Sequence, residues 1–556
     1  MMKKISILVF AVLVSSRLLA QIGPTVEVNR RYEVRPQDIS KPTLNLFIAD
    51  SLEKFDVSFD YSIFNRQYKD LYEFSPYESS QLKIIDVPKA PWFYARIGSQ
   101  FPLIPSAELY LQGGKIDGLH ASLYARHNST WGDIEDFANV ANMKNSVGAT
   151  ANYAWSTGEF TFDVQYKYDR FKYSQSETEW FDQHTNSSLN LMANLKSANS
   201  EENSVYYDVA LSYRNGKKGL LYDYDDQAST LGENFLRFNG DVGASFQKHR
   251  IYIDMDIEFA SYNSLRDFSS GIVELSPIYE YRNKWLDAKL GIKFGNYFML
   301  KGKEIDTDME DNATNFFPNI DARASIADKV FWIHAIIGGG NDLNSYITML
   351  DRCPVLSTDT DLLLGTRQID SKLAFETLIF GKFNFNLFGT YTLYDNHAVF
   401  KPTSSTDNVA SVINADYMDL TRMGAGVELF WESESVTAGG SLSYNIWKNR
   451  DEEKTVATEL PKIEGSGFFR YNFRERIIAQ VDCNYRSETS GLCAGAKSAT
   501  YSVDAILDLG FNLNFRINKN FSVYGKVGNI LDKRNQYTPL YIEPGRNYGG
   551  GVCISF

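Results

Sequence analysis

The stretch from Glu159 to Arg170 reads EFTFDVQYKYDR and alternates strictly between apolar and polar side chains. Every second side chain from Phe160 to Tyr168 is apolar or aromatic. The side chains between them are polar and carry charges of both signs. A period of two is typical of a β-strand with one apolar face and one wetted face. The pattern therefore predicts a strand, and it leaves open whether the apolar face contacts a protein core or lipid.

The same alternation recurs over much of the chain. Four further clear examples lie at 189–196, 205–214, 251–259 and 503–516. Tyr (34) and Phe (37) are abundant, and aromatic residues are enriched in strands. The mean hydropathy is negative and no long apolar run follows the N-terminus, which excludes a helical membrane protein. The pattern therefore favours an all-β fold.

The connections between these stretches alternate in length from about residue 90 to the C-terminus. Short polar segments such as STGE (156–159) and GK (381–382) alternate with longer irregular ones such as 215–232 and 340–369. Turn signals and periodicity predict about 22 strands of roughly 9 to 14 residues. Short turns on one side and long loops on the other are typical of outer-membrane barrels. We therefore predict a transmembrane antiparallel β-barrel with short periplasmic turns and long extracellular loops, its apolar faces toward lipid and its polar faces toward a lumen.

A soluble β-sandwich array or a propeller is the alternative reading of the same strands. Such folds predict turns of similar length on both sides and a repeat period. The sequence shows neither feature, and a single long meander offers no second set of strands to cover the apolar faces. A closed barrel, in contrast, satisfies the backbone hydrogen bonds of every strand within lipid.

The N-terminal part divides into two predicted segments ahead of the barrel. Residues 1–20 combine two lysines, a short apolar core and Ala20, which is the pattern of a secretory signal peptide. Residues 21–90 are interpreted as an ordered segment in the periplasm or the barrel lumen, and residues 91–556 as the barrel. This organisation predicts an outer-membrane location in a Gram-negative cell, with both termini in the periplasm.

Charge and motif searches narrow the possible functions. The net charge of −13 and the absence of a basic stripe exclude a nucleic-acid partner. No nucleophile motif, P-loop or close His/Cys metal pair is present, so we expect no enzyme activity, catalytic residue, cofactor or metal site. An acidic stretch at 304–315 is interpreted as a solvated loop, with calcium binding as the alternative. Cys353 and Cys493 either pair with each other or stay as separate thiols.

The C-terminal sequence resembles the last two strands of TonB-dependent receptors. It reads INKNFSVYGKVGNILDKRNQY and then EPGRNYGGGVCISF, and 316–346 is similar to a strand pair of the Bacteroidota branch of that family. The motif positions are Asn529, Ile530, Leu531, Asp532, Lys533, Pro544, Gly545, Arg546 and Phe556. The resemblance covers about 90 to 556, and the family's 22-stranded barrels agree with the count from the turns.

The resemblance implies partners as well as a fold. An apolar last strand ending in Phe is recognised in the family by the barrel-assembly machinery, and the matching side chains here are Tyr548, Val552, Ile554 and Phe556. The family carries a plug domain of well over a hundred residues and a segment that binds TonB. Only about 70 residues precede the first predicted strand here, and PTVEVN (24–29) is a weak match to a coupling segment. We therefore expect a barrel that lacks the conventional plug. The sequence does not decide whether this barrel couples to TonB.

Two functions follow from this reading. The first is passage of a nutrient or another solute through a polar lumen, whose acidic and amide side chains would disfavour anions. The second is a scaffold, in which the N-terminal segment, a plug or a lipoprotein partner closes the lumen and the barrel supports a surface or envelope-assembly complex. In both, the outer faces contact outer-membrane lipid and lipopolysaccharide.

Overall fold

The structure, a computed structural model, describes residues 91–113, 118–134, 137–175, 181–198, 204–222, 228–263, 268–301, 312–327, 330–402, 413–450, 460–493, 500–537 and 541–556. The predicted signal peptide, the segment 21–90 and most of the acidic stretch at 304–315 lie outside these residues. The strands are β1 (Phe93–Phe101), β2 (Ile104–Gly113), β3 (Leu119–Ile134), β4 (Phe137–Trp155), β5 (Gly158–Gln175), β6 (Phe181–Ser197), β7 (Ser204–Tyr222), β8 (Ala228–Phe246), β9 (His249–Asn263), β10 (Phe268–Arg282), β11 (Leu286–Lys301), β12 (Asn312–Ala327), β13 (Phe331–Leu343), β14 (Leu364–Ile379), β15 (Phe383–Pro402), β16 (Ile413–Glu432), β17 (Val436–Asn449), β18 (Ile463–Phe473), β19 (Ile477–Arg486), β20 (Thr489–Leu492), β21 (Thr500–Val503), β22 (Ile506–Arg516), β23 (Phe521–Gly528) and β24 (Asn547–Ser555).

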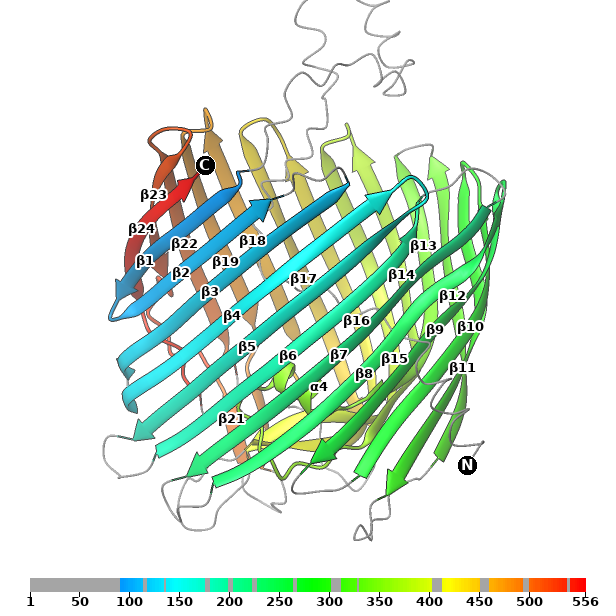
Figure 1. The fold of residues 1–556 in the computed structure, drawn as a ribbon, viewed down its shortest axis with the longest axis horizontal. Coiled ribbons are helices and arrows are strands. Elements are labelled where there is room, and N and C mark those ends of the chain that lie inside the picture. Colours follow the sequence, from blue (N-terminus) through cyan, green and yellow to red (C-terminus); the bar gives the residue numbers. More distant parts are fainter. Residues whose placement is uncertain are drawn as a thin grey trace, which may run out of the picture. The chain divides into compact units, whose positions relative to one another are not determined.

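Twenty-two of these strands form one closed antiparallel barrel (Figure 1). Each strand pairs with its neighbour in the chain, and β24 pairs with β1 to close the sheet. The short β20 and β21 pair only with each other, so β19 pairs directly with β22. The predicted all-β fold and the predicted number of strands are both confirmed. The closed sheet has no free edge, which meets the hydrogen-bonding demand of a lipid environment.

The turns have the predicted asymmetry from β11 to the C-terminus, but the expectation is wrong for the first ten strands, because only two residues join β1 to β2 and four join β9 to β10 at the opposite rim. Two residues join β4 to β5 and β8 to β9, and three join β14 to β15, β16 to β17 and β18 to β19. These turns share one rim with the start of β1 and the end of β24, and this rim is uppermost in Figure 1. We call it the short-turn rim and the opposite one the long-loop rim. The connections at the long-loop rim include 344–363, 487–505 and 529–546.

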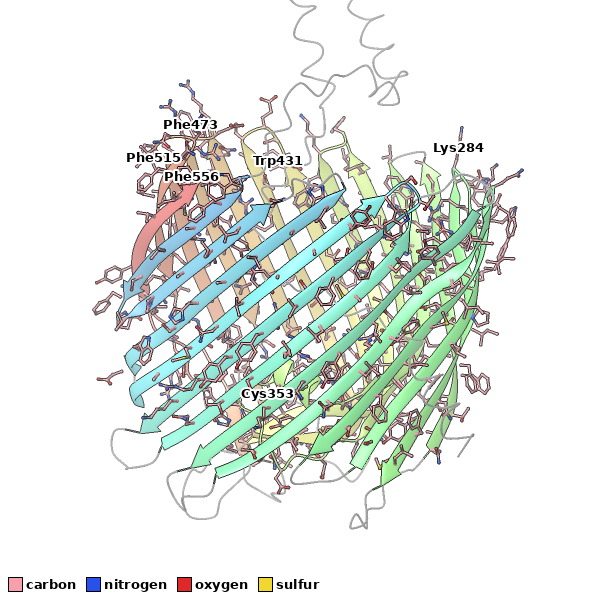
Figure 2. All side chains as sticks on the ribbon, in the orientation of Figure 1. Lys284, Cys353, Trp431, Phe473, Phe515 and Phe556 are labelled. Atoms are coloured by element: carbon pink, nitrogen blue, oxygen red, sulfur yellow. The ribbon has the colours of Figure 1, made fainter. Side chains whose placement is uncertain are left out.

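The two sets of alternating residues in β5 lie on opposite faces of the barrel wall, as predicted. In β5, Phe160, Phe162 and Tyr166 lie on the outer face and are each about 40% exposed despite being aromatic. Polar residues that continue the other side of the alternation, such as Lys167 and Asp169, face the interior and line a cavity there. Large apolar side chains are exposed on every strand of the barrel except β23, and Figure 2 shows side chains projecting outward from the wall. In a soluble protein this much exposed aromatic surface would be unfavourable, so the outer face is suited to lipid.

An aromatic belt marks the short-turn rim. Figure 2 shows Trp431, Phe473, Phe515 and Phe556 close to this rim, from four different strands or strand ends. All four are at least 40% exposed. Aromatic side chains gather at membrane–water interfaces because their rings suit the boundary between acyl chains and headgroups. The belt therefore places one membrane boundary at the level of the short turns.

The predicted strand length of roughly 9 to 14 residues is wrong for much of the barrel. β7 and β8 have 19 residues each, and β15 and β16 have 20. The segment 215–232 was expected to be a loop, but β7 continues to Tyr222 and β8 begins at Ala228. About 9 to 11 residues suffice to cross the hydrocarbon. Beyond it the backbone pairing continues in water, where side chains need not alternate, and the sequence pattern fades.

The barrel wall is uneven in height. Seven neighbouring strands, from β18 through β24 to β2 and omitting β20 and β21, have 8 to 11 residues, whereas β3 to β17 have 13 to 20. At about 3.3 Å per residue, the short strands suffice only to cross a membrane. The long strands extend further at the long-loop rim. No helix in the described part of the chain is long and apolar enough to span a membrane.

Candidate functional site

The connection between β13 and β14 folds into the barrel near the long-loop rim. It comprises residues 344–363 and contains the helix α4 (Tyr346–Arg352). In Figure 1 α4 lies within the outline of the barrel, and Cys353, which follows it, is labelled at the same level in Figure 2. We call residues 344–363 the lumen bridge.

Local sequence explains why the lumen bridge folds. Ser345 caps α4, because its hydroxyl accepts a hydrogen bond from the Thr348 N–H at 3.3 Å. The Tyr346 hydroxyl, which is buried, donates to the carbonyl groups of Leu356 and Ser357 at 3.1 and 2.8 Å. These bonds join the two ends of the bridge to each other, so backbone carbonyls buried there are paired.

One side of the lumen bridge is attached to β6, β7 and β8. The Arg214 guanidinium donates to both carboxylate oxygens of Asp351 at 3.0 and 2.8 Å. Asn186 and Lys218 both donate to the Pro354 carbonyl, at 2.9 and 2.8 Å. The buried Glu233 carboxylate accepts a hydrogen bond from the Ile347 N–H at 3.1 Å, which satisfies one free donor in the first turn of α4.

The other side of the lumen bridge is attached to β15 and β16. Leu356 forms an isolated parallel bridge with Ile413, and the Ser357 N–H donates to the Ile413 carbonyl at 2.8 Å. Arg352 donates to the Ala398 carbonyl at 3.0 Å. β6 and β16 are ten places apart in a ring of 22 strands. The bridge therefore links nearly opposite parts of the wall and divides the lumen at this level.

Apolar packing contributes more to the bridge than its ion pair does. A buried cluster joins the bridge to the inner faces of the wall: Val140, Phe171, Leu231, Phe235, Ala260, Tyr262, Ile272, Tyr297, Met299, Leu343, Tyr346, Ile347, Met349, Cys353, Val355, Leu356, Leu362, Ile413, Tyr541 and Ile542. Each fully buried large side chain contributes about 1.5–3 kcal/mol. The Asp351 side chain is 56% exposed, so its pair with Arg214 contributes at most about 1 kcal/mol.

The connection between β23 and β24 also contributes to this cluster. Tyr541 and Ile542 belong to the connection between β23 and β24 and are buried in the cluster. The Tyr541 hydroxyl lies 3.1 Å from the His184 ring on β6, and both side chains are buried. Two connections from different parts of the ring therefore meet over the same part of the mouth.

The inner wall beside the bridge carries paired charges. Arg237 on β8 contacts Asp256 at 2.7 Å and Glu258 at 3.1 Å, both on β9. Lys293 on β11 contacts Glu274 on β10 at 3.0 Å. The lumen acids expected to disfavour anions are thus partly compensated by cations on the neighbouring strands. The sequence alone does not reveal these ion pairs, because the paired residues lie on different strands.

Part of the wall from β17 to β19 differs, because small or exposed polar side chains face inward there. Ser441 on β17 and Ser466 on β18 face each other, 3.1 Å apart, and both are exposed. Arg470 on β18 is also exposed and bonds Gln480 on β19. The described residues therefore leave the inner face of this part of the wall open to water.

The C-terminal motif residues come together at the ends of the β23–β24 connection. The Asn529 side chain bonds both the N–H and the carbonyl of Lys533, at 3.0 and 2.7 Å, and also donates to the Pro544 carbonyl at 3.2 Å. Asp532 accepts a hydrogen bond from the Arg546 N–H at 2.7 Å. A Cβ atom on Gly545 would lie 2.9 Å from an Asp532 oxygen. Leu531 is exposed and takes no part in these bonds.

The last strand has the two faces that its sequence predicted. Tyr548, Val552 and Phe556 lie on the outer face and are exposed, and Ile554 shares this face because it also lies an even number of residues away in the strand. Cys553 lies on the inner face, where it accepts a hydrogen bond from the Tyr94 hydroxyl at 3.8 Å. The face is established by the structure, whereas recognition of this strand by an assembly machinery stays a prediction.

The cysteine and metal questions are answered for the described residues. All four cysteines lie among them, and none forms a disulfide. Cys353 is buried in the bridge, and burial raises the pKa of its thiol to about 12. Within the ranges that the structure describes, no group of three His, Cys, Asp or Glu side chains is arranged to hold a metal ion.

Sequence reasoning missed the lumen bridge and its contacts Arg214, Glu233 and Asp351. The segment was assigned to a long outside loop at 340–369. One signal was available: SYITML and PVL place apolar residues in a loop that should otherwise be polar. That signal predicts burial, but it does not identify the strands that the bridge contacts.

The comparisons with known proteins support the fold. No protein-family model and no curated protein matches the sequence. The structure is similar to that of the FrpB iron transporter from Neisseria meningitidis (F3-3 variant), with a TM-score of 0.64 at 10% identity over 84% of this chain and 82% of that one. It is similar to the siderophore receptor PirA from Acinetobacter baumannii, with a TM-score of 0.61 at 13% identity over 84% and 80%.

A third similar structure is the pyoverdine outer membrane receptor FpvA from Pseudomonas aeruginosa PAO1 bound to pyoverdine, with a TM-score of 0.62 at 12% identity over 85% of this chain and 79% of that one. The class defined by the fold is the 22-stranded outer-membrane barrel, and these structural neighbours are TonB-dependent receptors, as the C-terminal motif suggested. Identities this low establish the fold alone. Membership of the Bacteroidota branch and the lack of a plug remain predictions.

Proposed function

We propose that this protein is an outer-membrane barrel that takes up a solute, or supports its uptake, in a Gram-negative cell. The observation that carries the proposal is the two-sided wall, with exposed aromatic side chains outside and exposed polar side chains such as Ser441 and Ser466 inside. The names of the similar structures, an iron transporter and two receptors for siderophores, support uptake and give no support to an enzyme.

In the proposed orientation the short-turn rim and both termini face the periplasm, and the lumen bridge lies at the outside mouth. The outer faces contact outer-membrane lipid and lipopolysaccharide. The face of β24 that carries Tyr548, Val552, Ile554 and Phe556 would be the part recognised by the barrel-assembly machinery. TonB coupling would use PTVEVN (24–29), which lies outside the described residues.

Planar-bilayer recording tests the proposal. The matched variant replaces residues 346–361 with a short Gly-Ser linker, which can close the hairpin because Leu343 and Leu364 are paired. We expect a steady conductance from the wild type and a larger one from the variant, because the bridge divides the lumen. Silence from both proteins, with circular dichroism showing a folded barrel, would reject a transport function.

A closed scaffold barrel is the second candidate, and the lumen bridge is the observation that favours it. A wild type without conductance and a bridge-deleted variant with a large conductance would support this candidate. We propose that the N-terminal segment, residues 21–90, occupies the lumen. Recording the conductance of a variant that lacks these residues tests this role. We expect its conductance to rise, and an unchanged trace would reject that role for the segment.

A further inference from the structure

The ladder of backbone hydrogen bonds between β12 and β13 stops before either strand ends. The two strands pair over Ile320–Ala327 and Phe331–Ile337, next to the short-turn rim. Beyond these pairs, residues 312–319 of β12 pair only with β11, and residues 338–343 of β13 pair only with β14. All of these residues belong to the described part of the chain. The wall is therefore split between two neighbouring strands on the side of the long-loop rim.

Both strands carry residues that end the ladder at this point. Continued pairing would place Pro318 opposite Gly339, and proline has no N–H to donate. The N–H of Ser325, an odd number of residues away, points toward β11, so a donor at position 318 would have pointed toward β13. The run Gly338–Gly340 coincides with a β-bulge, and a Cβ atom on Gly339 would lie 2.6 Å from the Phe317 ring. The glycines therefore let β13 bend inward, against the inner face of β12.

The split begins close to the outer edge of the lipid-contacting band. The paired part of β12, Ile320–Ala327, rises about 20 Å from the short-turn rim, at about 3.3 Å per residue and a tilt of about 40°. The apolar band of such barrels is about 25 Å tall. Phe316 lies beyond the last pair and is 71% exposed on the outer face, with its ring centroid 5.3 Å from that of Phe294. In the proposed orientation, a molecule in the outer leaflet can therefore reach the split.

Contacts of side chains close the split. The Asn315 amide donates to the Asn341 side-chain carbonyl at 3.1 Å, and the Asn341 N–H donates to the buried Glu274 carboxylate on β10 at 2.7 Å. Phe317 fills the space beside Gly339. No bond of the β12–β13 ladder has to break for the described strands to part here. Parting them therefore costs fewer hydrogen bonds than parting a pair with a continuous ladder, such as β6 and β7.

The side chains on both sides of the split are apolar. On the outer face, Ile292 and Phe316 are exposed. On the inner side, Tyr297 and Met299 of β11 and Leu343 of β13 belong to the buried cluster of the lumen bridge. An apolar chain that passed through the split would thus remain in contact with apolar side chains from the lipid to the lumen.

We propose that this split is a lateral portal, through which a single-chain amphiphile such as a fatty acid passes between the outer leaflet and the lumen beside the bridge. The apolar chain follows the apolar side chains, and the polar head group passes the amides of Asn315 and Asn341. The open mouth beside β17 to β19 is a poorer route for such a solute, because the exposed inner wall there is polar. The portal rests on the proposed function for its role, as a side route by which the barrel takes up its solute.

Photo-crosslinking in lipid vesicles tests the portal. A palmitate with a diazirine on its chain is equilibrated with the full-length protein and illuminated, and mass spectrometry maps its attachment sites. Phe317→Cys/Gly339→Cys places two cysteines close enough to be joined across the split. The matched control, Thr185→Cys/Gly219→Cys, joins β6 and β7 where their ladder is continuous. Each variant is compared in its oxidised and reduced forms, and mass spectrometry verifies the disulfide.

We expect the wild type and the reduced variants to be labelled at the cluster residues inside the split. Oxidation of the Phe317/Gly339 pair should lower this labelling at least tenfold, because the strands can no longer part, and reduction should restore it. A second pair, Gly295→Cys/Asn341→Cys, ties the end of β13 to β11 and should have the same effect. Oxidation of the control pair should change nothing. Labelling of Phe162 on the outer face should be equal in every sample, because lipid reaches that face directly.

Absence of labelling inside the split overturns the portal. Labelling that neither disulfide across the split lowers also overturns it, because the probe would then arrive through the mouth. The crosslinking needs no ion flow, so its outcome is separate from the bilayer recording. Conductance without labelling inside the split would remove the portal and keep the uptake proposal. Disulfide-sensitive labelling without conductance would keep the portal and remove the uptake proposal.

Discussion

Phe93 and Phe556 close the barrel by exchanging backbone hydrogen bonds. The Phe93 N–H donates to the Phe556 carbonyl at 3.3 Å, and the Phe556 N–H donates to the Phe93 carbonyl at 2.9 Å. Their rings lie 6.0 Å apart on the outer face. The first and last strands are therefore joined up to the short-turn rim.

Deleting Phe556 should weaken this seam more than truncating its side chain does. Phe556→Ala keeps both backbone bonds and loses part of one ring's transfer free energy, about 1–2 kcal/mol of unfolding free energy in lipid. The deletion also removes two backbone hydrogen bonds, at about 1 kcal/mol each. Urea unfolding in lipid vesicles measures both variants. Equal stability of the two would show that the paired backbone at Phe556 contributes nothing to closure.

Tyr346→Phe should loosen the lumen bridge without removing its apolar contacts. The variant leaves the buried carbonyls of Leu356 and Ser357 without the hydroxyl donor, which costs about 1–3 kcal/mol. Cys353 follows α4 and is buried, so its rate of maleimide labelling reports opening of the bridge. We expect labelling to become at least several-fold faster. Tyr391→Phe, on the outer face of β15, is the control, and an equal labelling rate in both variants would contradict the proposed role of the Tyr346 hydroxyl in holding the bridge closed.

Alkaline pH should destabilise the bridge through the same thiol. Burial raises the pKa of Cys353 from 9.0 to about 12, so between these values the unfolded chain has lost a proton that the folded chain keeps. Stability is therefore unaffected below pH 9 and falls by about 1.4 kcal/mol per pH unit up to pH 12. Native-state proteolysis of the wild type and of Cys353→Ser across this window measures the difference. Parallel pH profiles of the two proteins would contradict the assigned burial.

Much of the barrel was predictable because each membrane-crossing strand contacts lipid on one face and the lumen on the other, so its residues alternate between apolar and polar. Phe160, Phe162 and Tyr166 face outward as the alternation required. The even number of strands, and the common rim of the short turns from β11 onward, followed from turn spacing alone.

The lumen bridge was not predictable in the same way. It packs against strands that are distant in sequence, such as β7 and β16, and its polar contacts pair single residues across that distance. Alternation carries no information on such pairing. The extent of the long strands was missed for a related reason, since outside the membrane their two faces no longer meet different solvents.

The Asn529 turn should be sensitive to loss of its side chain. Asn529 has a φ of 42°, a left-handed conformation that Asn tolerates better than most residues, and its amide holds Lys533 and Pro544. Asn529→Ala should lose about 2–3 kcal/mol of local stability through three hydrogen bonds and backbone strain. Asn529→Gly removes the same bonds but accepts the conformation, so it should lose less. Limited proteolysis of the β23–β24 connection measures both, and greater loss in the Gly variant would contradict the role of the strain.

The most direct test of the two-sided wall uses nitroxide labels at neighbouring positions of β5, in place of Phe162 and Asp163, with the protein in lipid vesicles. Relaxation by oxygen, which concentrates in lipid, and by a water-soluble nickel complex is measured for each label. We predict that the label at 162 responds mainly to oxygen and the label at 163 mainly to nickel, because Phe162 faces outward and Asp163 faces the lumen. Equal nickel access at both positions would contradict the account, because it would mean that the aromatic face of β5 is in water.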